Sequence, residues 1–143
     1  MEVLYMKILV PIDGSDNALL AVKYAGNMAN LQPDVHITLM YVITFEPYSM
    51  GDASFIEKSC RSEAEEALAH AEEVLDSVSP TKPDHYIGRG FSAADQILEV
   101  AESEKFDTIV MGSRGLSDLK RFFIGSVSTR VSQHAPCTVI LVK

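Results

Sequence analysis

The sequence predicts an α/β protein in which helices cover both faces of an open, twisted, five-stranded parallel sheet. Short apolar runs of strand length alternate along the chain with longer segments whose apolar residues recur at three- and four-residue steps. The short runs are nearly continuous, as in strands buried on both faces, and strands that alternate with helices pair in parallel. The expected strands are residues 7–12, 35–43, 84–88, 108–111 and 138–142.

Length and composition fit one domain, which we expect to span residues 1–143. The chain has 143 residues, enough for a sizeable core, and its hydrophobic fraction of 47% argues against disorder. The net charge of −8 comes from 12 basic and 20 acidic residues. That balance argues against a nucleic-acid partner, which needs a basic face, but not against a single nucleotide held by backbone amides.

The cysteines and the lengths of the apolar runs indicate in which cellular compartment the protein is expected. Cys60 and Cys137 form neither a CxxC pair nor a disulfide framework, which fits a reducing compartment. No apolar run reaches the roughly 18 residues of a membrane span, and residues 1–5 lack the basic and apolar regions of a signal peptide. We therefore expect a soluble, cytoplasmic protein that does not associate with membranes.

The first strand, residues 7–12, contains Pro11, which cannot donate a ladder hydrogen bond, so we expect pairing to loosen there. Asp13-Gly14-Ser15 then forms a turn, and Ser15 or Asp16 caps a helix with its apolar side between Ala18 and Ala29. Asp13 at the end of this strand can accept hydrogen bonds from ribose hydroxyls. An ordinary Asx turn also explains an Asp before Gly, and taken alone it is the more common role.

The middle of the chain carries few functional signals. Residues 44–54 contain Pro47 and Gly51 and show no period, so we expect a mobile loop over the site. Residues 57–78 give the longest helix signal, and their glutamates form a solvated face rather than a catalytic pair. Residues 84–88 are more polar than the other strands, which indicates a sheet edge. Residues 92–95 resemble a capping box for a helix that ends near Glu104.

Residues 107–128 carry the strongest functional signal. The strand 108–111 ends at Gly112, Gly115 follows after two residues, and Gly125-Ser126 follows after nine more. Gly125 permits a close approach because it has no Cβ, and Ser126 suits the N-cap of a helix over residues 127–134. The start of a helix attracts phosphate, so the pattern predicts an anion site at the carboxyl end of a buried strand. Three turn glycines and a capped helix explain the pattern as well.

The usual signatures of catalysis are absent from the sequence. There is no GxxxxGK[ST] motif, and the histidines pair with no cysteine or carboxylate at metal-ligand spacing. The serines near the glycines have no evident partnering base. Arg114, Lys120 and Arg121 can neutralise phosphate charge, although surface solvation is their more common role. We expect no catalytic residue and no metal ligands, and hydrolysis that is slow or incidental.

The spacing Gly112-x2-Gly115-x9-Gly125-Ser126, followed by Val127-Ser128-Thr129, resembles the ATP-binding signature of the universal stress protein family. Residues 10–15 and 135–137 extend the likeness, which covers essentially the whole chain. The resemblance implies a Rossmann-like fold of the adenine nucleotide alpha hydrolase-like group, with strand order 3-2-1-4-5. The switch point then lies between strands 1 and 4, where Asp13 and Gly112 meet.

The resemblance implies ATP as the ligand, with Mg²⁺ carried by the phosphates. We expect the phosphates on the backbone amides of residues 112, 114, 115, 125 and 126, assisted by the hydroxyls of Ser126 and Ser128. By resemblance, Val42 contributes to the adenine pocket. The expected binding residues are Pro11, Asp13, Ser15, Val42, Met111, Gly112, Arg114, Gly115, Gly125, Ser126, Val127 and Ser128.

Three functions fit these features. The first is an ATP-binding stress-response module whose conformation or partners depend on the nucleotide. The second is an enzyme of the same fold group that adenylates a substrate or hydrolyses ATP. Two features argue against an enzyme: no catalytic base is evident, and the turn Asp13-Gly14-Ser15 stands where adenylating relatives carry a glycine-rich pyrophosphate loop. The third is an interaction protein of the family that binds no nucleotide, and the glycine–serine signature argues against that.

The last strand predicts a homodimer, beside protein partners that the sequence does not identify. Residues 138–142 form an apolar run without proline or charge, and in the implied strand order they lie at a sheet edge. An open apolar edge invites pairing with another chain, and two copies related by a two-fold axis pair antiparallel. The alternative is an edge covered by the protein's own helix or N-terminal residues.

Overall fold

A computed structural model describes residues 5–45, 53–114 and 124–143, with side chains of the second helix from residue 57 onward. Five parallel strands form one sheet in the order β3-β2-β1-β4-β5, which confirms the predicted fold class and strand order. The polar strand β3 occupies one edge, as expected, and β5 the other. The strands are β1 (Met6–Ile12), β2 (Val35–Thr44), β3 (Asp84–Gly90), β4 (Thr108–Gly112) and β5 (Thr138–Val142).

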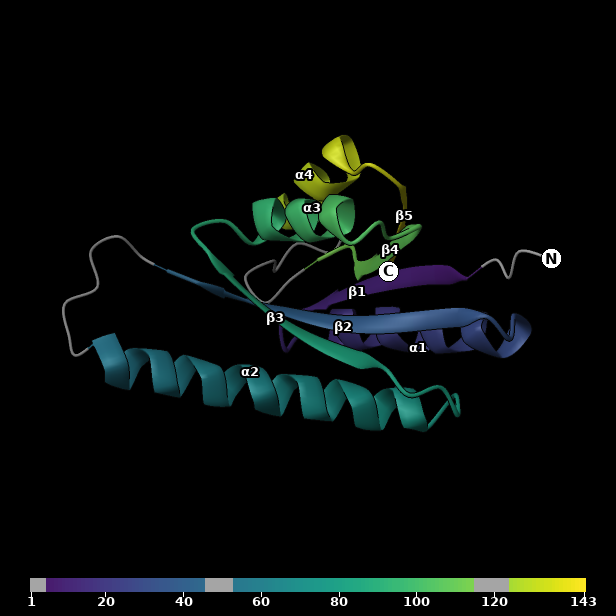
Figure 1. Cartoon of the computed structure of the whole chain (residues 1–143), viewed down its shortest axis with the longest axis horizontal. Coiled ribbons are helices and arrows are strands. Elements are labelled where there is room, and N and C mark those ends of the chain that lie inside the picture. The colour runs from purple at the N-terminus through teal and green to yellow at the C-terminus, as the bar shows by residue number, and fades with distance from the viewer. Residues whose placement is uncertain (1–4, 46–52, 115–123) are drawn as a thin grey trace.

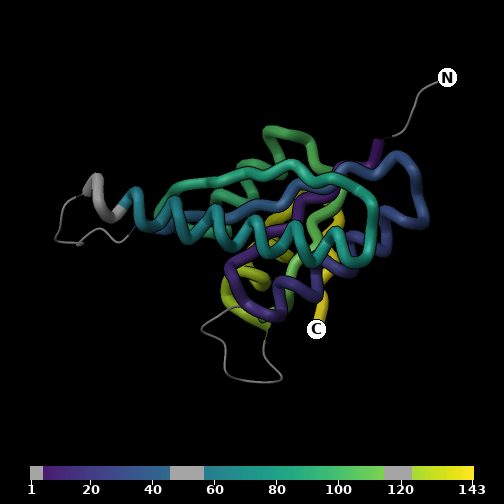
Figure 2. The backbone as a smooth tube through the Cα atoms, turned by 90° about the horizontal axis from the view of Figure 1, so that it is seen from below, coloured from purple at the N-terminus to yellow at the C-terminus, as the bar shows by residue number. Residues whose placement is uncertain are grey.

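Helices cover both faces of the sheet (Figure 1). On one face α1 (Asp16–Leu31) and α2 (Ala53–Asp76) pack on a core that includes Ile8, Leu39 and Leu68. On the other face α3 (Ala93–Ser103) and α4 (Ser126–His134) pack on a core that includes Leu9 and Ile109. Seen from the side of α2, this long helix runs in front of the strands (Figure 2). No helix in the described ranges is long and apolar enough to cross a membrane.

The limits of α2 differ from the expected residues 57–78. The helix begins at Ala53, inside the segment expected to be a loop, whose residues 46–52 lie outside the described part of the chain. It ends at Asp76, after which the turn tightens: the Val78 amide donates to the Leu75 carbonyl at 3.0 Å, and the Ser77 hydroxyl donates to the Val74 carbonyl at 2.6 Å. Val78 still packs closely against Gly26 of α1. The helical spacing of apolar residues therefore continues two residues beyond the end of the helix.

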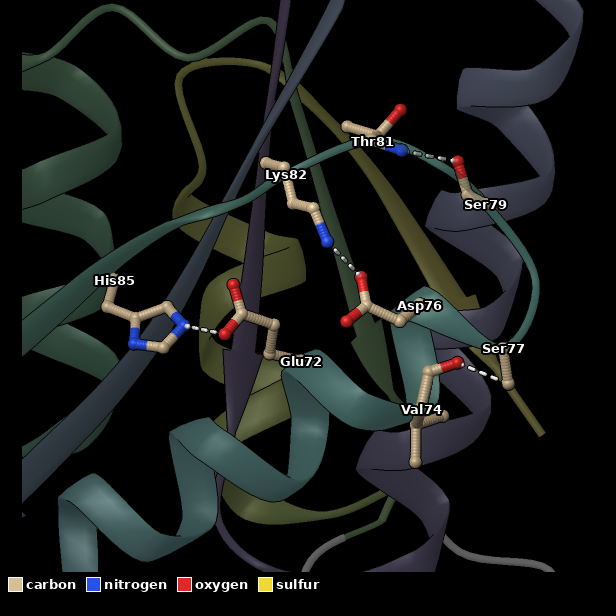
Figure 3. A network of polar contacts seen from close by, with 8 residues as sticks. All are labelled: Glu72, Val74, Asp76, Ser77, Ser79, Thr81, Lys82 and His85. Carbon is tan, nitrogen blue, oxygen red and sulfur yellow. Dashed lines mark hydrogen bonds and ion pairs between the residues drawn. The ribbon is translucent and has the colours of Figure 1, made fainter.

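Polar contacts fasten the connection from α2 to β3 (Figure 3). Lys82 Nζ lies 3.1 Å from Asp76 Oδ1, and the Thr81 amide donates to the Ser79 hydroxyl at 3.3 Å. His85 Nε2, on the edge strand, lies 3.8 Å from a carboxylate oxygen of Glu72. The glutamate side of α2 therefore makes surface contacts here, in agreement with its predicted solvated role.

Side-chain caps begin two of the helices. The Ser15 hydroxyl accepts from the Ala18 amide at 3.2 Å, and the Ser92 hydroxyl accepts from the Asp95 amide at 3.2 Å, so both serines are N-caps as predicted. The second half of the predicted capping box is replaced by another contact. The Asp95 carboxylate accepts from Arg130 of α4 at 2.9 Å, which links α3 to α4.

The predicted N-cap of α4 was wrong by one residue. Gly125 is the N-cap, with an extended backbone and no side-chain cap, and Ser126 is the first helical residue. The reason is local: the Gly125 carbonyl accepts the first helical hydrogen bond, from the Thr129 amide at 2.9 Å. The start of α4 therefore has a backbone hydrogen bond but no capping side chain.

Strand β1 is paired unequally with its two neighbours. Its register with β2 runs from Met6 to Ile12, whereas its register with β4 contains only Ile8 with Thr108 and Leu9 with Ile109. The loosening expected near Pro11 therefore occurs on the side of β4. Because β1 and β4 part at their carboxyl ends, the sheet opens at the predicted switch point.

Candidate functional site

A cavity of about 440 Å³ lies where β1 and β4 part, within the range of roughly 300–1,000 Å³ found for small-molecule sites. All six elements around it begin or end at the carboxyl edge of the sheet: β1, β2 and β4 end there, and α1, α3 and α4 begin there. The cavity is lined by Pro11, Ile12, Asp13, Ala18, Met40, Val42, Ala93, Ile97, Met111, Gly112, Arg114, Gly125, Ser126, Val127 and Ser128.

The lining divides into two chemically different walls. We call the contribution of β2 and α3 the apolar wall, which consists of Met40, Val42, Ala93 and Ile97. The polar wall comes from the end of β4 and the start of α4, namely residues 112, 114 and 125–128. Because β1 lies between β2 and β4 in the sheet, Asp13 stands between the two walls.

Asp13 makes the Asx turn that was one of the two roles considered for it. Its Oδ1 accepts from the Ser15 amide at 2.9 Å, which makes the Asx turn. Gly14 completes this turn with φ of +86°, a left-handed conformation that favours glycine. A carboxylate has two oxygens and about four acceptor positions, so Asp13 keeps capacity to accept from a ligand while it holds the turn.

Tyr41 reports the electrostatics around this carboxylate from the other face of the sheet. Burial raises the pKa of the Tyr41 phenol above its ordinary value, and the negative charges of Glu63 and Asp13 raise it further. The negative charge near the carboxyl end of β1 therefore acts on the pKa of Tyr41 in the same direction as its burial does.

The polar wall is held together by its own backbone. The Ser113 carbonyl accepts from the Gly125 amide at 2.6 Å and from the Ser128 hydroxyl at 3.0 Å, while the Ser113 amide donates to the Val142 carbonyl of β5 at 2.9 Å. The Ser128 hydroxyl also lies 3.1 Å from the Gly112 carbonyl. Ser128 is buried, and its only hydroxyl hydrogen is used within the protein, so its expected donation to a phosphate is not available in this arrangement.

The amides predicted to bind phosphate are only partly free. The Arg114 amide donates to Asn17 Oδ1 at 2.8 Å, and the Gly125 amide donates to Ser113. The first amides of a helix, in contrast, have no acceptor within the helix. In α4 these belong to Ser126, Val127 and Ser128, all of which line the cavity. Among the described residues, the donors available to an anion therefore lie in the first turn of α4.

Two of the predicted site residues are not placed in the cavity lining. Ser15 caps α1 and lines a second cavity, of about 270 Å³, between α1 and α2. Gly115 lies outside the part of the chain that the structure describes. The other predicted residues, from Pro11 to Ser128, all line the cavity of about 440 Å³.

Sequence reasoning missed Ile12, Ala18, Met40, Ala93 and Ile97, which complete the lining. One signal was present for Met40: it is two residues before Val42, so the two side chains share a face of β2. Ile97 had no such signal, because it belongs to the apolar stripe of α3 and packs in the core at the same time.

The sequence model of the universal stress protein family matches residues 4–143. The chain belongs to the universal stress protein family. A universal stress protein of Methanocaldococcus jannaschii is 36% identical over 146 residues, which covers 99% of this chain and 84% of that protein. A putative universal stress protein of Staphylococcus haemolyticus is 34% identical over 142 residues, which covers 97% of this chain and 85% of that protein.

Solved structures of universal stress proteins share the fold. The universal stress protein UspA from Lactobacillus plantarum superposes with a TM-score of 0.85 at 27% identity, covering 99% of this chain and 100% of that one. A universal stress protein from Archaeoglobus fulgidus superposes with a TM-score of 0.75 at 23% identity, covering 99% and 100%. The predicted family is thus confirmed, and its characteristic fold extends over nearly the whole chain.

Proposed function

We propose that this universal stress protein binds ATP in the cavity at the switch point and acts as a nucleotide-dependent regulatory module. The observation that carries the proposal is the division of the cavity into an apolar wall and a polar wall with Asp13 between them. An adenine nucleotide has the same order of groups: an apolar base, a ribose with hydroxyl donors and an anionic phosphate chain.

In the proposed pose the base lies against Met40, Val42 and Ile97, and the ribose hydroxyls donate to Asp13. The phosphates lie at the start of α4, where free amides and the helix dipole favour an anion. Arg114 adds a positive charge to this wall. Mg²⁺ would arrive with the phosphates: within the described ranges no group of three or more His, Cys, Asp or Glu is arranged as a metal site.

Solved structures of this fold lend the proposal background support. One universal stress protein, at 24% identity and a TM-score of 0.73, was determined in complex with cAMP, and the Archaeoglobus fulgidus protein in complex with dAMP. At these identities the likeness concerns the fold, so the choice of ligand rests on the cavity of this chain.

Calorimetric titration with ATP tests the proposal through Asp13. We expect Asp13→Ala to weaken binding by roughly 1.5–3 kcal/mol, the usual worth of a hydrogen bond to a charged group. Asp13→Asn is the matched variant, because an amide oxygen still accepts from the Ser15 amide and keeps the turn. We expect it to lose affinity as well, since its nitrogen cannot accept from a ribose hydroxyl. Full affinity in Asp13→Asn would make Asp13 a turn residue only.

We expect ATP turnover far below the roughly 1–10³ s⁻¹ typical of enzymes. Among the described residues of the lining, Asp13 is the only carboxylate, and it lies at the ribose position rather than beside α4. The described part of the lining therefore places no base near the proposed phosphates to activate water. Phosphate release at saturating Mg·ATP measures this directly. A rate above about one per second in carefully purified protein would favour the alternative, an ATP-hydrolysing enzyme.

We further propose a homodimer that pairs through β5, in the cytoplasm, with protein partners still to be identified. In support, β5 is an edge strand and none of its residues is fully buried. Cys60 and Cys137 are free thiols, which fits a reducing compartment.

A further inference from the structure

Asn17, which does not line the cavity, contacts the end of β4 from the other side. It is the second residue of α1, and its Oδ1 accepts from the Arg114 amide at 2.8 Å across 97 residues of chain. A Cβ on Gly112 would lie 2.4 Å from this same oxygen and 3.0 Å from the carbonyl carbon and oxygen of Asn17. Gly112 is therefore required by the packing of α1, and Asn17 touches both ends of the segment 112–114.

The same segment is bound to α4 on its opposite side. The Ser113 carbonyl accepts from the Gly125 amide and from the Ser128 hydroxyl. Residues 112–114 are thus held between Asn17 on one helix and the first turn of α4 on the other. Because that first turn supplies the free amides of the polar wall, a change in the segment also moves those amides.

The first turn of α1 holds the ribose side of the site as well. It begins directly after the Asp13 turn, where Asp13 accepts from the Ser15 amide and Ser15 accepts from the Ala18 amide. Asn17 is the residue of this turn that reaches across to β4. The first turn of α1 therefore carries both the hydrogen bonds of the Asp13 turn and the contact with the polar wall.

We propose that Asn17 is a positioning residue that sets the affinity for the phosphates by holding the Arg114 amide; this inference rests on the proposed ATP site. Asn17 turns that amide toward α1 and fixes residues 112–114, so that the first turn of α4 faces the phosphates. Asn17 is not part of the apolar wall. Replacing Asn17 therefore weakens the binding of ATP. It leaves the binding of adenosine unaffected, because adenosine has no phosphate.

Asn17→Leu tests the inference, because leucine has a similar branched shape and no acceptor. Asn30→Leu is the matched control: Asn30 is on the same helix, and its Nδ2 donates to the Val78 carbonyl at 2.7 Å, away from the cavity. Titrations use ATP and adenosine. We expect Asn17→Leu to bind ATP about tenfold more weakly and adenosine within about twofold of the parent, as expected when one backbone donor loses its partner. Asn30→Leu should match the parent with both ligands.

Hydrogen exchange at the Arg114 amide gives a second readout that needs no ligand. We expect protection in the parent, rapid exchange in Asn17→Leu, and restored protection in Asn17→Asp, which keeps the accepting oxygen. Unchanged ATP affinity in folded Asn17→Leu, or equal losses for ATP and adenosine, would overturn the inference alone. A parent protein that binds neither ligand would refute the proposed function, and this inference with it.

Discussion

Gly125→Val is expected to abolish ATP binding while the protein remains folded. Gly125 lines the cavity immediately before the free amides of α4, so a branched side chain there occupies the space proposed for the phosphates. Its φ of −64° and ψ of 161° are open to any residue, and extended backbone suits valine. The substitution therefore adds bulk without straining the backbone, and the bond from the Gly125 amide to Ser113 stays possible.

Calorimetry with ATP and circular dichroism on the same preparation check this expectation. Ile124→Val is the control, because Ile124 is the preceding residue, is half exposed and does not line the cavity. We expect no heat of binding for Gly125→Val and parental affinity for Ile124→Val. Unchanged affinity in a folded Gly125→Val protein would exclude phosphate binding at the start of α4.

Ile140→Lys is expected to convert a homodimer into monomers. Ile140 lies in the middle of β5, paired with Val110 of β4 on one side, while the other side of the strand is a sheet edge. Antiparallel pairing of two β5 strands would bring the two copies of residue 140 close to the two-fold axis. Two buried ammonium groups in that contact repel each other and lose hydration. Val139→Pro should act in the same direction by removing a backbone donor.

Light scattering at micromolar concentration measures the masses. The parent should give twice the monomer mass of 15.7 kDa, and Ile140→Lys should give the monomer mass. Tyr86→Lys, at an exposed position of the opposite edge strand β3, is the control and should remain dimeric. A parent mass of 15.7 kDa would refute the dimer, whatever the variants showed.

The fold was predictable because every strand and helix carries its own local signal. Continuous apolar runs marked the buried strands, and the polar composition of residues 84–88 marked the edge. Helix limits were less predictable where packing overrides local pattern. Val78 has the apolar spacing of a helical residue because it packs on Gly26, although the helix has already ended at Asp76.

The location of the candidate site was also predictable, whereas its hydrogen bonds were not. Glycine spacing and the position of Asp13 after β1 indicated the edge of the sheet at which the cavity lies. Which amides remain free depends on acceptors far away in sequence, such as Asn17 for Arg114. No motif in the sequence marks Asn17, and only the close approach of α1 to Gly112 gives it a role.

The hydrogen bond from the Ser113 amide to the Val142 carbonyl joins the polar wall to the last residue of β5. Nucleotide binding at one end of this bond is coupled to association at the other end only if ATP binds the monomer and the dimer with different affinities. If ATP strengthens the association of two subunits through β5 by some factor, association must strengthen ATP binding by the same factor. The apparent affinity for the nucleotide would then depend on protein concentration, and one hydrogen bond would let a cell's supply of ATP act on assembly.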